Sequence, residues 1–337
     1  MTNKERMRRA IEFDGPDYPP VMGGFSPATW ARYREALVPY AERLGVPVPG
    51  DFDAMPKGWR AGESFRDNYG CLWECQVTGL QGIIKEHPLS DWSRLESYRF
   101  PDPLTQGANG VFDLPVFAAQ VATELKEWTW AGGYENSYWE RLHFLRGYEQ
   151  TLMDLADEDE RLFRLLDLIL EHNLVFLRAV VETMADGVFF GDDWGDQQRL
   201  MIPPKQWRRI FKPGYRAMFQ TCRKKEKHVF FHTDGFLMDV VPDLVECGVS
   251  VLNLQSRANG LDRIAAECGG RVCVAIDIDR QHVLPFGSPS DVRNHIRECV
   301  EKLDRHGGVI VLWNVNPDVP LANIAALTVA IEELRKS

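Results

Sequence analysis

The chain has 337 residues, of which 45% are hydrophobic and 26% are charged. That is enough apolar sequence for a large core, and it excludes a disordered protein. The net charge of −10 argues against general nucleic-acid binding, which needs a basic face. No apolar run approaches the roughly 18 residues of a membrane span. The N-terminus lacks a signal-peptide core, and the odd number of scattered cysteines, seven, is typical of a reduced, cytoplasmic protein.

Regular elements are sparse in the first half of the chain. Residues 19–25 and 127–134 predict strands, and residues 141–185 predict two long helices. Between them lies a stretch rich in Gly, Pro and Trp, in which residues 67–92 predict a small β insertion. No segment has the composition of a linker, so we expect a single domain over residues 1–337.

Two cysteines of this insertion, Cys71 and Cys75, are spaced Cys-x3-Cys. We interpret them as packed thiols rather than a metal pair, because no second Cys/His pair follows at zinc-finger spacing.

The second half alternates strands with helices, in five units. The predicted strands are 187–195, 229–232, 249–255, 272–279 and 309–314, and the predicted helices are 203–225, 236–248, 261–270, 289–308 and 320–336. The strands are continuously apolar, which indicates a parallel sheet with both faces covered. Polar residues follow nearly all of them. A barrel gathers such strand ends into one mouth, whereas an open sheet concentrates its site at one switch point. We therefore predict a TIM-type (β/α)8 barrel with the N-terminal insertion over its C-terminal mouth.

Two strand ends carry the candidate catalytic residues. "GDDWGDQQ" places Asp192 and Asp193 side by side, so one can face the mouth while the other faces helices. The mouth-facing one could bind a cation, orient a ligand amine or hydroxyl, or act as a base. In "HTDG", His232 and Asp234 share one face of an extended chain. They could be two metal ligands, a base with its orienting carboxylate, or merely the end of a turn; we favour the base.

Further polar residues at the strand ends are candidates for substrate binding. They are Asp192, Gln198, Asn253, Gln255, Asp277, Asp279, Trp313 and Asn314. Each alone is more often a turn or hydrogen-bonding residue, but together they would line a single cavity.

These motifs resemble those of the uroporphyrinogen decarboxylase superfamily. The similar segments are 5–21, 67–74, 87–103, 140–155, 188–213, 232–255, 278–292 and 316–327. The most specific is 188–213, "VFFGDDWGDQQRLMIPPKQWRRIFKP". The resemblance implies a single TIM-type barrel with its site at the C-terminal mouth. It also implies either porphyrinogen decarboxylation or methyl transfer between a corrinoid and a thiol or other acceptor.

The chain departs from both activities of the superfamily. The decarboxylases grip substrate carboxylates with an Arg-Gln-Ala-Gly-Arg-Tyr segment, where this chain has "VMGGFSPATWARY" with Arg32 alone. The thiol methyltransferases hold zinc with His-x-Cys and a later Cys. Here Asp234 replaces the first cysteine, and Trp313 stands at the later position. We therefore expect no tightly bound cofactor, with zinc on His232 and Asp234 the less favoured possibility.

The resemblance and the residues together predict a corrinoid-linked methyltransferase acting on a small polar methyl donor or acceptor. His232, Asp234 and Asp193 would be catalytic, and the corrinoid would come on a partner protein, because the chain has no Asp-x-His-x-x-Gly motif. One alternative is a cofactor-free decarboxylase of a small carboxylic acid, with Arg199 and Arg280 as its carboxylate-binding residues. A non-catalytic ligand-binding barrel is the other. The acidic helical surface is compatible with a homodimer.

Overall fold

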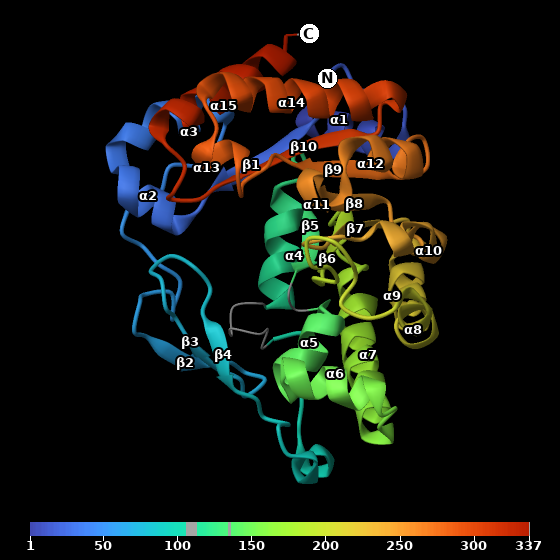
Figure 1. The fold of residues 1–337 in the computed structure, drawn as a ribbon. Coiled ribbons are helices and arrows are strands. Elements are labelled where there is room, and N and C mark those ends of the chain that lie inside the picture. Colours follow the sequence, from blue (N-terminus) through green and yellow to red (C-terminus); the bar gives the residue numbers. More distant parts are fainter. Residues whose placement is uncertain (106–112, 134–135, 337) are drawn as a thin grey trace. The chain divides into compact units, whose positions relative to one another are not determined.

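The structure is a computed structural model that describes residues 1–105, 113–133 and 136–336. The chain forms two compact units (Figure 1). The first unit comprises Met1–Ala61, Val77–Gln81 and Val251–Ser337, and the second comprises Gly62–Gln76 and Gly82–Ser250. Each unit contains parallel strands and helices, which confirms the predicted α/β class. None of the helices in the described part of the chain has the length and apolar character needed to span a membrane.

The first unit contains four parallel strands. Their order is β1 (Val21–Phe25), β10 (Val309–Val315), β9 (Cys273–Asp277) and β8 (Val251–Gln255). Every residue of β8 and β9 is buried, as expected of apolar strands that are covered on both faces. The predicted strands of this region are confirmed, but Asp279 lies beyond the end of β9 rather than within it.

Helices accompany these strands and pack against one another. They are α1 (Asn3–Glu12), α2 (Pro27–Tyr33), α3 (Val38–Leu44), α11 (Ser256–Asn259), α12 (Leu261–Cys268), α13 (Val283–Phe286), α14 (Pro289–Leu303) and α15 (Leu321–Leu334). Helix α14 contacts α12 and α15, and α15 contacts α3 (Figure 1). The N-terminus of α14 has a capping box between Ser288 and Asp291.

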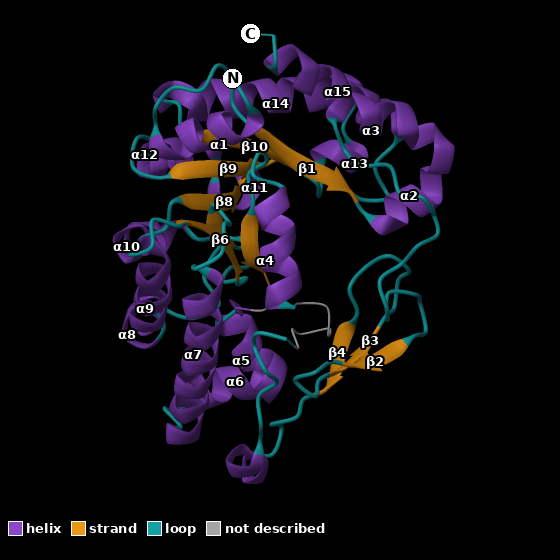
Figure 2. Ribbon diagram, turned by 180° about the vertical axis from the view of Figure 1, so that it is seen from behind, coloured by secondary structure: helices purple, strands orange, loops and turns teal. Residues whose placement is uncertain are grey.

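The second unit contains three parallel strands and a separate antiparallel sheet. The parallel strands are β5 (Trp130–Gly133), β6 (Gly187–Gly191) and β7 (His228–His232), in that order. The antiparallel sheet is β2 (Ser64–Arg66), β3 (Leu72–Glu74) and β4 (Ile83–Glu86), orange arrows in Figure 2. It confirms the predicted β structure in residues 67–92. Residue 134, which ends the predicted strand 127–134, lies outside the described residues.

The helices of the second unit differ in number from the prediction. They are α4 (Leu114–Thr123), α5 (Trp139–Arg146), α6 (Tyr148–Ala156), α7 (Glu160–Val180), α8 (Pro204–Ile210), α9 (Lys212–Arg223) and α10 (Val241–Cys247). Of the two helices predicted over 141–185, the second is confirmed as α7. The first was wrong as a single helix, because Gly147, at a φ of 99°, separates α5 from α6. The single helix predicted over 203–225 was also wrong. Pro213 lies in the first turn of α9, where a missing N–H costs nothing.

A cluster of buried aromatic rings supports the ends of β6 and α5. The indoles of Trp139 and Trp194 stack with their centroids 4.7 Å apart. Trp194 also contacts Phe211 edge-on, and its Nε1 donates a hydrogen bond to the Tyr215 hydroxyl at 2.7 Å. Both tryptophans are almost completely buried, so they belong to the core and are not exposed walls of a binding site.

Candidate functional site

The loops that follow β6 and β7 are joined to each other. The two strands end in register, with Gly191 opposite His232. Beyond them, the backbone N–H of Asp234 donates to Asp193 Oδ1 at 2.7 Å. The N–H of Trp194 donates to Thr233 Oγ1 at 3.0 Å. These bonds fix the two loops together, so the side chains at the strand ends have little freedom to separate.

The loops touch at two glycines. A Cβ atom on Gly235 would lie 2.0 Å from the carbonyl oxygen of Gly195. A Cβ on Gly195 would lie 2.2 Å from the carbonyl oxygen of Phe236. Any larger residue would push the backbones apart, so the spacing of the catalytic candidates depends on the absence of side chains here.

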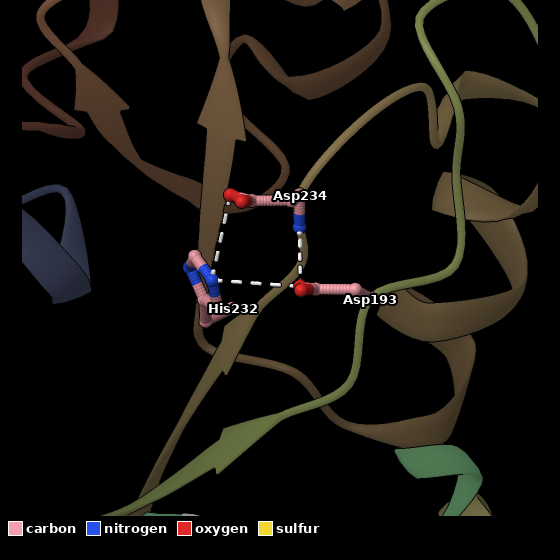
Figure 3. A group of neighbouring side chains, drawn as sticks. All are labelled: Asp193, His232 and Asp234. Carbon is pink, nitrogen blue, oxygen red and sulfur yellow. Dashed lines mark hydrogen bonds and ion pairs between the residues drawn. The ribbon is translucent and has the colours of Figure 1, made fainter. Parts of the chain in front are cut away.

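The joined loops bring the three predicted catalytic residues together (Figure 3). His232 Nε2 lies 3.6 Å from Asp193 Oδ1 and 3.6 Å from Asp234 Oδ1. Side-chain exposures of 20% for His232, 37% for Asp193 and 38% for Asp234 leave all three within reach of a small molecule. The sequence placed His232 and Asp234 on one face, and the structure adds Asp193 from the neighbouring strand end. An imidazole beside carboxylates is a common arrangement in sites that move protons.

The adjacent Asp192 points into the interior instead. Its carboxylate accepts hydrogen bonds from the backbone N–H groups of Tyr138 and Glu140 and from the Tyr215 hydroxyl, at 2.8 to 3.0 Å. Burial raises the pKa of Asp192 to about 7, while the three donors act in the opposite direction. The sequence expected one of the two neighbouring aspartates to face away, and Asp192 is that one. Its bonds favour a structural role over the predicted role in substrate binding.

Sequence reasoning missed Glu140, an acid of α5. Glu140 is 7% exposed, and burial together with the charges of Asp193 and Asp192 raises its pKa well above the usual range. The guanidinium of the next residue, Arg141, lies over the Tyr69 ring at 3.5 Å. A glutamate in the first turn of a helix is common, so nothing in the sequence distinguished this one.

A second polar group lies in the first unit. Asp277 pairs with Arg280 and Asp279 with Arg257, each at 3.2 Å. Together with Gln255 these residues line one small pocket. Burial alone would raise the pKa of Asp279, but backbone N–H groups and Arg257 outweigh it and hold that pKa below the usual range. Three predicted substrate-binding residues therefore do lie together.

The remaining predicted residues are placed differently. Asn253 is buried, and its Nδ2 donates to the Ala275 carbonyl at 2.7 Å. Trp313 is 2% exposed and packs edge-on against Phe25. Asn314 is half-buried, whereas Gln198 is exposed. Asn253 and Trp313 are therefore part of the core, which favours a structural role for them over the predicted contact with substrate.

The residues do not fit a thiol-activating zinc site. The ligand atoms of Asp193, His232 and Asp234 lie within 4.8 Å of one another, close enough to share a cation. However, the thiol methyltransferases that the sequence resembles hold zinc with His-x-Cys and a later Cys. Asp234 supplies a carboxylate, and the indole of Trp313 has no ligand atom. Cys71 and Cys75 are both buried, and neither is part of a disulfide.

Comparison with known proteins agrees with this fold. A methyltransferase from Methanosarcina mazei is similar over 99% of both chains, with a TM-score of 0.71 and 18% identity. At that identity the likeness concerns the fold. A dihydropteroate synthase from Xanthomonas albilineans matches 50% of this chain and 61% of its own at 16% identity, with a TM-score of 0.33 that carries no weight. No curated protein matches the chain. The model of the uroporphyrinogen decarboxylase (URO-D) family matches residues 78–334, most of the chain, and the protein therefore belongs to the uroporphyrinogen decarboxylase family.

Proposed function

We propose that this protein is a methyltransferase that moves a methyl group between a small polar substrate and a corrinoid carried by a separate protein. The observation that carries the proposal is the imidazole of His232 between the carboxylates of Asp193 and Asp234. The fold shared with a methyltransferase is consistent with it. We further propose that the parallel strands belong to a closed (β/α)8 barrel with the β2–β4 insertion over its mouth.

In this proposal His232 handles the proton of the heteroatom that loses or gains the methyl group. A heteroatom that gains a methyl group must lose a proton, and one that loses a methyl group can gain a proton. Asp193 and Asp234 would stabilise the imidazolium and orient the substrate through hydrogen bonds. The corrinoid, when bound, supplies the nucleophile or the methyl group.

The alternative of decarboxylation has less support. Holding a substrate carboxylate in a site requires a cationic donor that is available to it. The side chain of Arg199 is 84% exposed and forms an ion pair with Asp196. Arg280 is less exposed, but it is paired with Asp277. Neither is therefore favourably placed to select a substrate acid.

The test is a methyl-transfer assay with free reduced cobalamin and a panel of methylated amines, ethers and thiols, followed by the cobalamin absorbance. We expect one donor class to be used, with a loss of about 100-fold or more in His232→Ala, as for removal of a general acid–base. His306→Ala, which removes an exposed histidine, is the matched control and should keep full activity. Activity that survives His232→Ala, or release of carbon dioxide from small acids without any methyl transfer, would refute the proposal.

A further inference from the structure

Glu140 is a buried acid that the proposed reaction leaves without a role. The residue is more than nine-tenths buried, and its Oε2 has no hydrogen-bond partner among residues 1–105, 113–133 and 136–336. Its backbone N–H donates to Asp192 Oδ1 at 2.8 Å, which fixes the start of α5 at the end of β6. A buried carboxyl oxygen without a partner is costly unless the group is neutral or a ligand satisfies it.

The charged groups around Glu140 are mostly negative. Asp192 and Asp193 face it from the end of β6 and Asp234 from the loop after β7, while Arg141 follows it on α5. Burial and the three aspartates raise the pKa of Glu140, and Arg141 alone among these groups lowers it. Burial and the neighbouring aspartates therefore favour the protonated form of the Glu140 carboxyl. A cation that arrived beside these carboxylates would favour its ionised form.

An aromatic ring lies beside His232, the residue that the two carboxylates flank. The ring of Phe189, in β6, lies nearly parallel to the imidazole of His232, at an interplanar angle of 20° and a centroid distance of 6.3 Å. Gly191 stands beside both rings: a Cβ on it would be 3.5 Å from Phe189 and 3.9 Å from His232. Phe189 is half-buried, so part of its ring is accessible. An aromatic ring attracts a methylated ammonium group through its face, and carboxylates in the same site attract the positive charge.

We propose that the substrate of this site is an N-methylated ammonium ion, which lies by its charge near Asp193 and Asp234. Such a cation would favour release of the Glu140 proton when it binds. The identity of the reaction rests on the proposed function, whereas the binding does not. In transfer from a quaternary ammonium, the C–N bond breaks and nitrogen keeps its electron pair. The methyl group passes to the nucleophilic corrinoid named above. The amine that remains can then take a proton from His232.

Calorimetric titration with choline tests the binding directly. The control ligand is 3,3-dimethylbutan-1-ol, which has the same shape without the charge. We expect choline to bind at least about tenfold more tightly than this alcohol. Titrations in two buffers of different ionisation enthalpy should show release of up to about one proton per choline near neutral pH. The affinity of the wild type should rise with pH, by at most about tenfold per unit.

Two variants separate the role of Glu140 from general electrostatics. Glu140→Gln should bind choline without releasing a proton, and its affinity should not change with pH in this range. Glu149→Gln, an exposed acid of the neighbouring α6, should behave like the wild type. Asp193→Asn should weaken choline binding by about tenfold without removing the proton release.

Three results would overturn the inference. Choline could bind no better than the alcohol, or proton release could persist in Glu140→Gln. Elemental analysis could also find a stoichiometric divalent metal that His232→Ala removes, which would make the group a metal site. Methyl transfer from a neutral ether without choline binding would refute this inference and leave the proposed function standing. Choline binding without any methyl transfer would refute the proposed function and leave this inference standing.

Discussion

Replacement of Gly235 by alanine tests whether the joined loops set the spacing of the catalytic group. Gly235 has a φ of 77°, and an added Cβ would lie 2.0 Å from the Gly195 carbonyl oxygen. Gly45, at the end of α3, has the same φ of 77° but nothing within 4 Å of an added Cβ. Gly45→Ala therefore carries only the cost of the left-handed backbone, about 1 kcal/mol. Gly235→Ala adds overpacking of about 1–3 kcal/mol, for a total of about 2–4 kcal/mol.

Urea unfolding of both variants measures this difference, and the methyl-transfer assay measures its effect on the site. Because the loops must separate, Gly235→Ala should also lengthen the hydrogen bond from Asp234 N–H to Asp193 Oδ1 and lower the methyl-transfer activity. Gly45→Ala should leave the methyl-transfer activity unchanged. Equal losses of stability in the two variants, within about 0.5 kcal/mol, would refute the close approach of the loops.

Two further predictions concern stability. Burial, together with the charges of His87 and Arg141, lowers the pKa of His143 to about 3. The neutral His143 side chain therefore contributes its full stability to the fold above the usual histidine pKa of 6.5, and this contribution is lost as the pH falls towards 3. The wild type should lose about 3 kcal/mol from this group by about pH 4, and a His143→Phe variant should show a shallower pH dependence of urea unfolding. Arg146→Met should cost about 3–5 kcal/mol in the same assay, because the Arg146 guanidinium is buried against Asp154. Arg199→Met, which breaks an exposed pair, should cost less than about 1 kcal/mol, and similar losses in the two would contradict the argument.

The sequence was informative where one physical rule decided the structure. The runs in β6 to β10 are apolar at nearly every position, and only strands covered on both faces need that pattern. Helix boundaries were less predictable. Gly147 and Pro213 interrupt continuous helical patterns, because whether a glycine or proline breaks a helix depends on tertiary packing that the pattern does not contain.

The candidate site was predictable in part for the same reason. His232 and Asp234 are two residues apart, so local geometry alone placed them together. Asp193 joined them through strand register and a loop contact, which have no signature in a single sequence. Glu140 lies in a helix about fifty residues before Asp193 in the chain, and only its burial distinguishes it from other glutamates.

The hydrogen bonds of Asp192 hold the start of α5 in place without using any side chain of that helix. Asp192 binds the backbone N–H groups of Tyr138 and Glu140, and every amino acid except proline supplies such a group. The side chain at position 140 can therefore change without loss of these hydrogen bonds. A lineage with this fold could replace the acid there by a neutral or basic residue and bind a substrate of different charge at the same site. Diversification of substrate at this site would then require one substitution rather than a new loop.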